Sequence, residues 1–389
     1  MRNNLNSIGD LRSRARRRLP RMVFDFLEGG ALDELTLRRN REQLDAQLLA
    51  QRVLFDAAPT SATTSILGTA LELPLIVSPM GLLTVCHPDA DVAIAKAVAD
   101  AGSIFTHSPW SGCSLDEVVA AAPGRVWAQI AFWTDAAETR RHIDQARALG
   151  VDTLVVAGDV GVSSKRDRDL RHGTGMPPKP PLVDVIDTAL HPGWVLRWLT
   201  GRSMTWGNYT IGGRRIRMGE MEHWMEANEN PSATWDDLAR LRREWDGRIV
   251  VKGIMSTADA RTAVEVGVDG VFVSNHGGRQ FDSQKATIET LPRIVEEVAG
   301  RAAVIMDGGI RRGSDIAKGL ALGADVVAAG RPFAFGLSAG GQAGVARAFE
   351  VLHDELVTAM GFVGVAEIAQ LSAEILDTSV VRERVGAVR

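Results

Sequence analysis

Short apolar runs alternate with longer helical stretches along most of this chain. Eight runs of four or five residues, rich in β-branched side chains, lie at 75–78, 103–107, 126–130, 153–157, 249–252, 270–274, 303–307 and 326–329. Such runs predict strands, and their nearly continuous hydrophobicity is typical of parallel strands covered by helices. Eight strand-and-helix units predict a closed (β/α)8 barrel, the TIM barrel, within the α/β class.

The stretches between these runs support the same fold. Residues 89–101, 136–149, 257–266 and 312–322 have a helical period of apolar positions, and a glycine follows each of them. A glycine there can take the left-handed conformation that ends a helix and turns the chain into the next strand. The alternative is a doubly wound open sheet, but no GxGxxG motif follows the first predicted strand.

We interpret residues 1–389 as one domain with two additions to the barrel. Residues 1–60 form a helical, partly amphipathic N-terminal segment that ends in coil around Pro59. Residues 160–233, between the fourth and fifth strands, form an excursion with a proline-rich run at 176–181 and four tryptophans. Long excursions inside a domain are usually lids or binding loops, so we expect this one to lie over the active-site face.

Composition and charge exclude several classes of protein. The 44 basic and 48 acidic residues leave no basic excess, so we expect no nucleic-acid partner. Cys86 and Cys113 form neither a CxxC motif nor a zinc-ligand spacing, so we expect free thiols and no metal site. The first twenty residues carry charges where a secretory signal needs an apolar run, and no 18-residue apolar stretch follows. We therefore expect a cytoplasmic protein.

Polar residues at and after the predicted strands mark the candidate site, because such a barrel carries its active site at the C-terminal strand ends. The motifs DGGIR at 307–311 and GR at 330–331 combine glycine amides with arginines, which suits a phosphate. After the sixth strand, His276 offers a base and Arg279 a planar fork for a carboxylate. Asp159 can orient that imidazole, and Lys252 can face a group that gains negative charge.

The sequence SNHGGRQ at 274–280 is similar to the signature of the FMN-dependent 2-hydroxy-acid oxidases and dehydrogenases. This family includes glycolate oxidase, lactate oxidase and mandelate dehydrogenase. LPRMVFDFLEGG at 19–30 resembles its N-terminal segment, KRDRDL at 165–170 its strand-four loop, and the DGG and GR motifs its phosphate cradle. LHPGW at 190–194 is most similar to mandelate dehydrogenase. The resemblance covers nearly the whole chain and implies oxidation of a small L-2-hydroxy-acid substrate with FMN as cofactor.

The resemblance implies roles for the polar residues. His276 would take the substrate's proton with support from Asp159, and Arg279 and Arg166 would hold the carboxylate. Lys252 would lie near the N1–C2 edge of the flavin, and the backbone of Gly81 near N5. The implied cofactor-binding residues are Pro79, Met80, Gly81, Ser108, Gln129, Lys252, Ser274, Asp307, Gly308, Gly309, Arg311, Gly330 and Arg331.

The chain departs from the family's pattern in the substrate pocket. Phe26 and Ala131 stand where the family has tyrosines, and the chain's single tyrosine, Tyr209, lies in the excursion. A threonine near the flavin is replaced by Ala157. Each lost hydroxyl removes a hydrogen bond to a charged group, worth about 1.5–3 kcal/mol. Unless other groups replace the hydroxyls, Phe26, Ala131 and Trp110 would line a pocket for a bulky or aryl substrate.

Two other functions stay open. An FMN-dependent oxidase of a specialised metabolite that is not a simple 2-hydroxy acid would suit Phe26 and Ala131, whereas His276 and the two arginines suit a carboxylate. A flavin-binding protein without turnover would not need the pairing of His276 with Asp159. Oxygen, a quinone and a redox protein are all candidate electron acceptors.

The surroundings of the enzyme are also open to prediction. Tryptophans at 194, 198 and 206 mix with arginines at 197, 202, 214 and 215, which suits a membrane interface or a lid on the protein's own barrel. We expect the lid, with peripheral contact to the inner face of the membrane as the alternative. The family resemblance further implies a homo-oligomer, a homotetramer.

Overall fold

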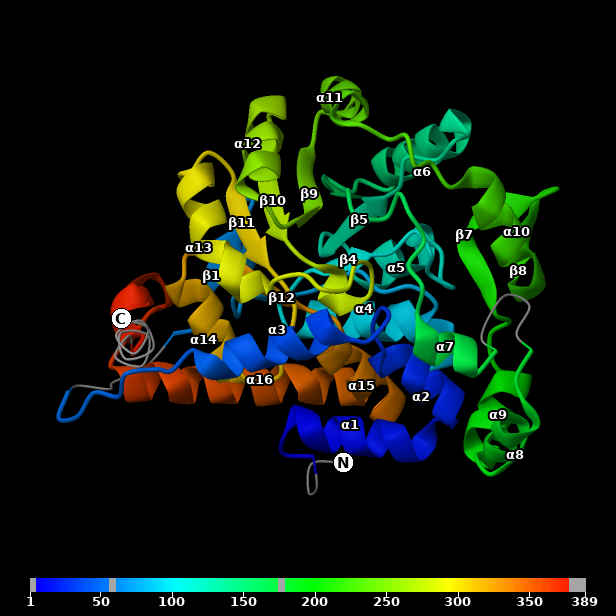
Figure 1. The fold of residues 1–389 in the computed structure, drawn as a ribbon, viewed down its shortest axis with the longest axis horizontal. Helices are drawn as coiled ribbons and strands as arrows, with labels where there is room; N and C mark the ends of the chain where they lie inside the picture. Colours follow the sequence, from blue (N-terminus) through cyan, green and yellow to red (C-terminus); the bar gives the residue numbers. More distant parts are fainter. Residues whose placement is uncertain (1–4, 56–60, 174–178, 378–389) are drawn as a thin grey trace.

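Eight parallel strands close into a barrel in a computed structural model that describes residues 5–55, 61–173 and 179–377 (Figure 1). Consecutive strands are neighbours, and the last pairs with the first. The strands are β3 (Leu75–Val77), β4 (Phe105–His107), β5 (Val126–Ile130), β6 (Thr153–Ala157), β9 (Arg248–Ile254), β10 (Gly270–Val273), β11 (Ala303–Met306) and β12 (Val326–Ala329). The predicted TIM barrel is confirmed, and the open-sheet alternative is wrong.

Helices cover the outside of the barrel. They are α4 (Ala90–Asp100), α5 (Leu115–Ala121), α6 (Ala136–Ala148), α11 (Trp235–Glu244), α12 (Thr257–Val266), α13 (Thr287–Val298), α14 (Gly313–Ala321), α15 (Arg331–Gly340) and α16 (Gln342–Val363). The glycines after four of them have positive φ angles, between 60° at Gly102 and 97° at Gly323. The predicted left-handed helix ends are therefore present.

Apolar side chains fill the N-terminal end of the barrel, and polar groups line its C-terminal end. Trp127, Phe272 and Ile305 belong to one fully buried cluster inside the strands. The hairpin of β1 (Thr64–Ile66) and β2 (Thr69–Leu71) adds Ile66 and Leu71 to that cluster. Because this end is packed and closed, the site can open only towards the C-terminal ends of the strands.

The N-terminal helices reach that C-terminal end. They are α1 (Ile8–Arg18), α2 (Arg21–Glu28) and α3 (Leu35–Ala46), and they lie along one side of the barrel (Figure 1). Asn40 of α3 exchanges side-chain hydrogen bonds of 2.9 and 2.7 Å with Asn275, after β10. Arg41 donates to Asp315 and to the Gly309 carbonyl, after β11. The coil expected around Pro59 falls outside the described residues.

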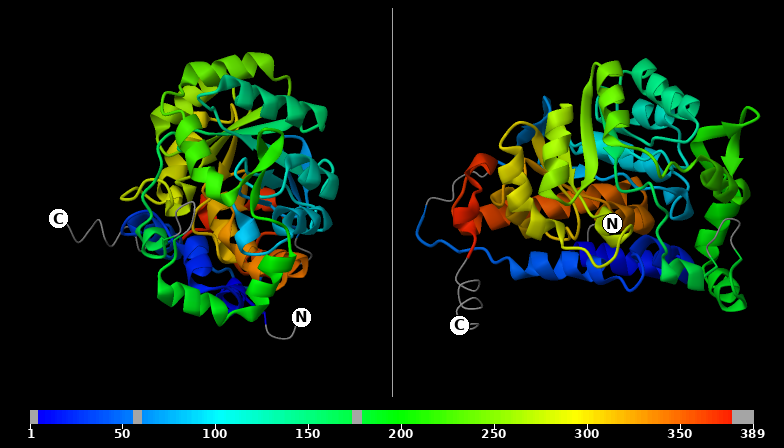
Figure 2. Two further views of the ribbon diagram at one scale, coloured as in Figure 1. Left: turned by 90° about the vertical axis from the view of Figure 1, so that its right-hand side faces the viewer. Right: turned by 45° about the horizontal axis from the view of Figure 1, so that its top comes forward.

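The excursion divides into two parts that lie on the same side of the barrel (Figures 1 and 2). The first contains α7 (Asp167–Arg171), α8 (Leu182–Ala189) and α9 (Pro192–Thr200); the second contains β7 (Thr205–Ile211), β8 (Arg214–Arg217) and α10 (Met218–Asn228). Trp206, Tyr209 and Trp224 of the second part are buried against Trp133, which follows β5. The proline-rich run at 176–181 is only partly within the described residues. Among the described helices, none is long and apolar enough to cross a membrane.

A matched pair of glycines tests the helix ends. Gly267 after α12 has φ of 85°, whereas Gly361 lies in the last turn of α16, and a Cβ at either would meet nothing within 4 Å. We expect Gly267→Ala to lower the free energy of unfolding by about 1 kcal/mol, because L residues disfavour the left-handed region. Gly361→Ala should raise it by about 0.5 kcal/mol, because alanine favours helix. Denaturant unfolding of both variants would contradict this explanation if their shifts had the same sign.

Candidate active site

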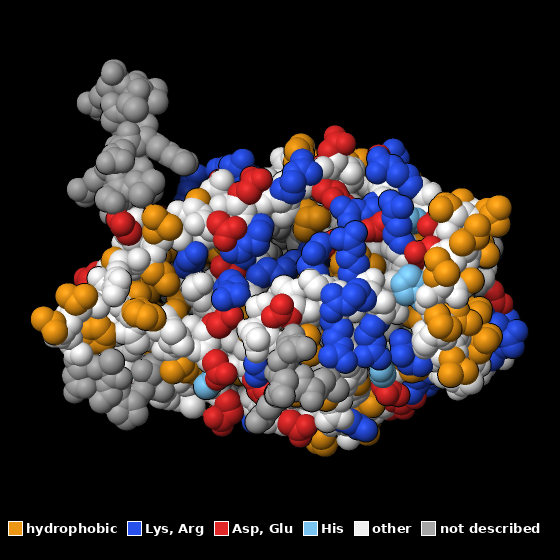
Figure 3. All heavy atoms as spheres, turned by 90° about the horizontal axis from the view of Figure 1, so that it is seen from below, with side chains coloured by type: hydrophobic (Ala, Val, Ile, Leu, Met, Phe, Trp, Pro, Cys, Tyr) orange, Lys and Arg blue, Asp and Glu red, His pale blue; other side chains and the backbone are white. Residues whose placement is uncertain are grey.

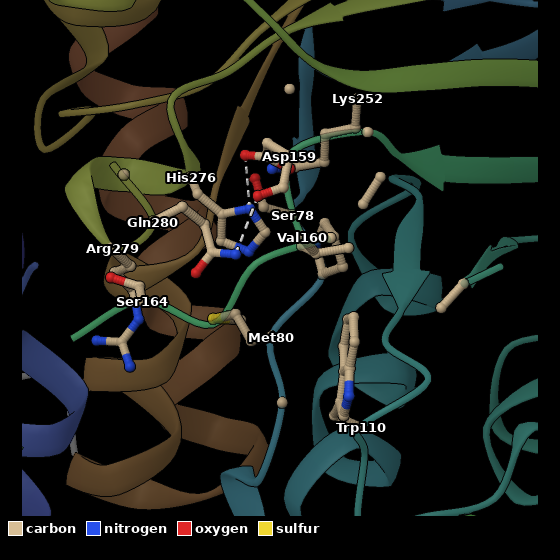
Figure 4. A pocket seen from close by; sticks show the side chains of 18 of the residues that line it. Ser78, Met80, Trp110, Asp159, Val160, Ser164, Lys252, His276, Arg279 and Gln280 are labelled. Atoms are coloured by element: carbon tan, nitrogen blue, oxygen red, sulfur yellow. Dashed lines mark hydrogen bonds and ion pairs between the residues drawn. The ribbon is translucent and has the colours of Figure 1, made fainter. Parts of the chain in front are cut away.

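A cavity of about 800 Å³ opens at the C-terminal ends of the strands. All the predicted site residues line it except Ser108, Gln129 and Ser274. Figure 4 shows His276, Asp159 and Lys252 on one side of this space and Trp110 on another. Side chains from β6, β9, β10 and the N-terminal helix α2 therefore meet at one site.

His276 and Asp159 form the central polar contact (Figure 4). The Nδ1 atom of His276 lies 3.0 Å from Oδ2 of Asp159. Burial alone would raise the pKa of Asp159, but the charge and hydrogen bond of His276 lower it below its ordinary value. The carboxylate is therefore ionised near neutral pH and holds the proton on Nδ1, which leaves Nε2 as the ring atom that can accept a proton.

The backbone around His276 is tightly bent. His276 and Gly277 have φ angles of 56° and 62°, and the His276 N–H donates to Ser274 Oγ over 3.1 Å. Left-handed backbone at a histidine costs energy and is retained where surrounding contacts fix it. Ser274, predicted to bind the cofactor, does not line the cavity, and its Oγ accepts hydrogen bonds from this turn and from Lys252.

Lys252 is almost fully buried, with 2% of its side chain exposed. Its Nζ atom donates to Ser274 Oγ over 2.7 Å and lies 3.5 Å from Asp307 Oδ2. Asp307 also accepts a hydrogen bond of 3.2 Å from Ser78. A buried ammonium fixed in this way can stabilise negative charge that develops in the cavity.

Three partly buried arginines, Arg279, Arg311 and Arg331, also line the cavity, and none forms an ion pair with a carboxylate of the described residues. Arg279 and Arg331 both donate to the Gly29 carbonyl over 2.8 Å. Burial and then neighbouring arginines lower the pKa of Arg279 to about 10 and that of Arg331 well below its ordinary value. Burial and Arg41 lower the pKa of Arg311 to about 10. Partly buried cations without a paired carboxylate favour an anionic ligand.

The surroundings of these arginines fit a cofactor that carries a phosphate and a flat polar ring. Gly308 and Gly309 have φ angles of 96° and 86°, and a Cβ on Gly309 would lie 2.6 Å from the Asn40 carbonyl oxygen. Only glycine therefore fits at this turn, and its backbone amides stay uncovered for phosphate oxygens. Among the described residues, Gln129 Nε2, Asp307 Oδ1 and Arg331 Nε are buried without a hydrogen-bond partner.

The two arginines predicted to hold a carboxylate, Arg279 and Arg166, line the same cavity as His276. Arg279 stacks over the ring of Phe26, with 5.2 Å from its Cζ atom to the ring centroid, and donates to the Phe26 carbonyl. Arg166 lines the cavity and pairs through Nε with Asp169 over 2.8 Å. Each arginine is therefore held in place by a protein contact while it also lines the cavity.

Aromatic side chains form the remaining wall. Ala131 lines the cavity next to Trp133, Trp206 and Met225, of which the last two come from the excursion. Tyr209 is fully buried, and its hydroxyl accepts a hydrogen bond of 3.0 Å from Trp133 Nε1. It therefore does not replace the hydroxyls that Phe26 and Ala131 lack, and the wall is apolar.

Some contributors to the site were missed in the sequence. A Cβ on Gly253 would lie 2.7 Å from Asp159 Cγ, so only glycine fits beneath the carboxylate. Gln280 donates to the Asp159 carbonyl over 3.1 Å, and Ser78 supports Asp307. Gly253 and Ser78 come at strand ends, a signal that could have identified them. Trp206 and Met225 carry no such signal, because their place depends on how the excursion folds back.

Comparisons with known proteins agree with this geometry. Residues 15–378 match the model of the FMN-dependent dehydrogenase family. An L-lactate dehydrogenase of Serratia proteamaculans is 38% identical over 371 residues, 94% of this chain and 97% of that protein. A putative L-lactate dehydrogenase of Mycobacterium tuberculosis is 36% identical over 94% of this chain and 87% of its own length.

Solved structures of mandelate enzymes are also similar. The monotopic membrane protein (S)-mandelate dehydrogenase superposes with a TM-score of 0.92 at 33% identity, covering 96% of this chain and all of that one. Mandelate oxidase with (S)-4-hydroxymandelic acid gives 0.82 at 34% identity, over 96% and 98% of the two chains.

Arg331 offers a test of the phosphate cradle. Arg331→Met keeps length and removes the charge, so we expect the dissociation constant of FMN to rise about 10-fold or more, as for a lost charged hydrogen bond. Riboflavin lacks the phosphate, so its affinity should not change. Flavin fluorescence titrations of the stripped protein measure both constants. An equal loss for FMN and riboflavin would mean that Arg331 acts only through its bonds to Gly29 and Gly277.

Proposed function

The chain belongs to the FMN-dependent dehydrogenase family, and from that premise we propose that it oxidises a bulky or aryl L-2-hydroxy acid to the 2-oxo acid. The FMN-dependent oxidation of 2-hydroxy acids is the chemistry of this family. One observation carries the finer proposal. His276, paired with Asp159, shares a cavity with two carboxylate-binding arginines and an apolar wall that has no tyrosine hydroxyl.

His276 acts as the base in this proposal. Its Nε2 atom accepts a proton from the substrate, and the Asp159 carboxylate stabilises the imidazolium that results. A base placed in this way commonly contributes about 10²–10⁴ in rate. When bound, FMN accepts the hydride that leaves the carbon bearing the hydroxyl.

The other polar residues bind and orient. Arg279 and Arg166 hold the substrate carboxylate through charge-assisted hydrogen bonds. Lys252 is fixed by Ser274 and Asp307. It would stabilise the negative charge of the reduced flavin ring. We assign the phosphate of the cofactor to Gly309, Arg311, Gly330 and Arg331, and its ring to the region of Met80, Gly81 and Gln129. Ser108 supports the loop there, because its Oγ accepts the Trp110 N–H over 3.2 Å.

A bulky substrate follows from the apolar wall. Phe26 and Ala131 supply no hydroxyl, and Ala131, beside Trp133 and Trp206, is smaller than tyrosine by about one phenol ring. Buried aromatic surface favours an aryl group through contacts of about 0.5–1.5 kcal/mol for each ring pair. A specialised metabolite without a carboxylate would leave Arg279 and Arg166 without an anion, so we favour the 2-hydroxy acid.

We further propose peripheral membrane contact through the first part of the excursion. The exposed side chains of α8 and α9 are strongly apolar: Leu182, Val183, Val185, Ile186, Leu190, Leu196, Trp198 and Leu199. Figure 3 shows hydrophobic side chains gathered at this end beside a band of Lys and Arg. Burial and then the charges of Arg197 and Arg14 lower the pKa of Arg18 there. An apolar face with a basic border suits an anionic lipid surface.

In this proposal the two parts of the excursion have different roles. The α8–α9 part meets lipid at the inner face of the membrane, and the β7–β8–α10 part is the lid over the cavity. Membrane contact favours a quinone as the electron acceptor, with oxygen and a redox protein as the alternatives. The homotetramer stays a prediction, which light scattering of the purified enzyme tests.

Refilling the tyrosine position tests the substrate class. Ala131→Tyr should lower kcat/KM for (S)-mandelate by about 10-fold or more, because the ring would occupy the space of the aryl group. The value for L-lactate should hold or rise. Phe26→Tyr is the matched control, since it restores a hydroxyl without filling that space and should not lower either value. Steady-state rates with an artificial acceptor give the constants, and equal losses for both substrates in Ala131→Tyr would contradict the proposal.

Vesicle sedimentation tests the membrane surface. Wild-type enzyme should pellet with phosphatidylglycerol-containing vesicles, and the double variant Leu182→Asp, Ile186→Asp should pellet several-fold less. Phe362→Asp changes an exposed apolar residue of α16 and should pellet like wild type. Wild-type enzyme that stays in the supernatant, or an equal loss in Phe362→Asp, would rule out this surface.

A further inference from the structure

His172, at the end of α7, lies between carboxylates of two other helices. Its Nε2 atom is 2.7 Å from Oδ2 of Asp25 on α2, and its Nδ1 atom is 2.9 Å from Oδ2 of Asp184 on α8. The histidine side chain is 8% exposed and that of Asp184 is 4% exposed. This trio, which we call the α2–α8 clasp, lies outside the catalytic cavity and has no part in the mechanism above.

The geometry of the clasp fixes the protonation state of the imidazole. A neutral imidazole has one N–H, so it can donate to only one carboxylate, and its other nitrogen would place a lone pair against the second. With both carboxylates ionised, two contacts at hydrogen-bond distance therefore require the imidazolium. Burial lowers the pKa of His172, but the hydrogen bonds that it donates to Asp184 and Asp25 outweigh this effect, so the pKa lies above its ordinary value.

Other charges surround the clasp on each element packed against it. Arg21 of α2 lies 3.6 Å from Asp25, and its N–H donates to Asp187 of α8 over 2.6 Å. Arg168 of α7 lies 3.4 Å from Asp25 and also pairs with Glu34 and, more distantly, Glu28. Asp169 of α7 is the remaining charged neighbour of His172. Asp25 therefore contacts Arg21 and Arg168 as well as His172. Among the described residues, His172 is the cation that pairs with Asp184.

The clasp connects the apolar surface to the cavity. Asp184 lies among the exposed apolar residues of α8, between Val183 and Val185. Asp25 precedes Phe26, whose carbonyl accepts from Arg279 and whose ring lies under the Arg279 guanidinium. A change at His172 therefore acts on α8 and on the segment that holds Arg279.

We propose that His172 is a positioning residue whose imidazolium ties α8 to α2 and so fixes both the apolar surface and the Phe26–Arg279 wall of the cavity. Loss of its proton leaves Asp184 buried without a cation, and the tie breaks. The effect of the clasp on the cavity rests on the proposed role of Arg279, whereas the tie between the helices does not.

The direction of the pH dependence follows from the raised pKa. The stabilisation by the clasp is fully present below the ordinary histidine pKa of about 6.5, and it is lost as the pH rises through the higher folded value. The α8 helix should therefore open at alkaline pH, and the cavity should bind the substrate carboxylate less tightly there.

Hydrogen–deuterium exchange of the FMN-loaded enzyme across pH, corrected for intrinsic exchange, measures the tie without any substrate. Wild-type α8 should lose protection in one step as the pH rises, and His172→Gln should lack protection throughout. Asp184→Asn is the decisive variant, since an amide can donate to a neutral Nδ1 while Nε2–H donates to Asp25. It should keep α8 protected with no step.

Two exchange results would overturn the proposal. One is wild-type α8 with no step, and the other is a step that persists in Asp184→Asn. The second result would mean that the step does not depend on the contact between His172 and Asp184.

Steady-state kinetics then test the link to the cavity. In wild type the KM for (S)-mandelate should rise several-fold across the same step while kcat changes little, and Asp184→Asn should show a flat KM. A flat KM in wild type despite a step in exchange would overturn the link and keep the tie. Absence of turnover with an intact exchange step would count against the proposed function alone.

Discussion

Closure of the parallel barrel is the constraint on which the site depends. Because all eight strands run the same way, their C-terminal ends surround one opening, and polar residues from distant parts of the sequence meet there. The packed cluster around Trp127 and Phe272 closes the opposite end. At this rim, Arg279, Arg311 and Arg331 are partly buried and form no ion pair among the described residues. Under the proposed function, a bound phosphate and a substrate carboxylate would supply anions for them.

Much of this arrangement could be predicted from the sequence, because hydrophobic periodicity is local. The strand positions follow it closely, and only β9 extends clearly beyond its predicted run at 249–252, to Arg248–Ile254. Most of the predicted site residues line the cavity because they lie at the ends of correctly predicted strands. The fold of the excursion could not be predicted in this way, because contacts with Trp133 and α2 fix its hairpin and helices. Its own sequence pattern does not determine their position. Asp25 and His172 are 147 residues apart, so no local signal links them.

The absence of tyrosine at positions 26 and 131 and the fold of the excursion affect the same cavity. Ala131 opens the wall, and the excursion fills part of that wall with Trp206 and Met225. The same excursion then exposes the apolar side chains of α8 and α9. Under the proposed function, apolar contacts in the pocket would replace the hydrogen bonds of tyrosine hydroxyls, and Arg279 and Arg166 would still bind a carboxylate. One insertion between β6 and β9 therefore both lines the cavity and carries an exposed apolar surface.

The measurement that tests the account most directly is the visible spectrum of the purified, FMN-loaded enzyme under anaerobic conditions during addition of (S)-mandelate, L-lactate and glycolate in turn. The account predicts that mandelate bleaches the flavin band much faster than glycolate, and that His276→Asn, with its FMN bound, bleaches slower by about 10²-fold or more. Flavin that stays oxidised with every 2-hydroxy acid, or a His276→Asn variant that reacts as fast as wild type, would contradict it.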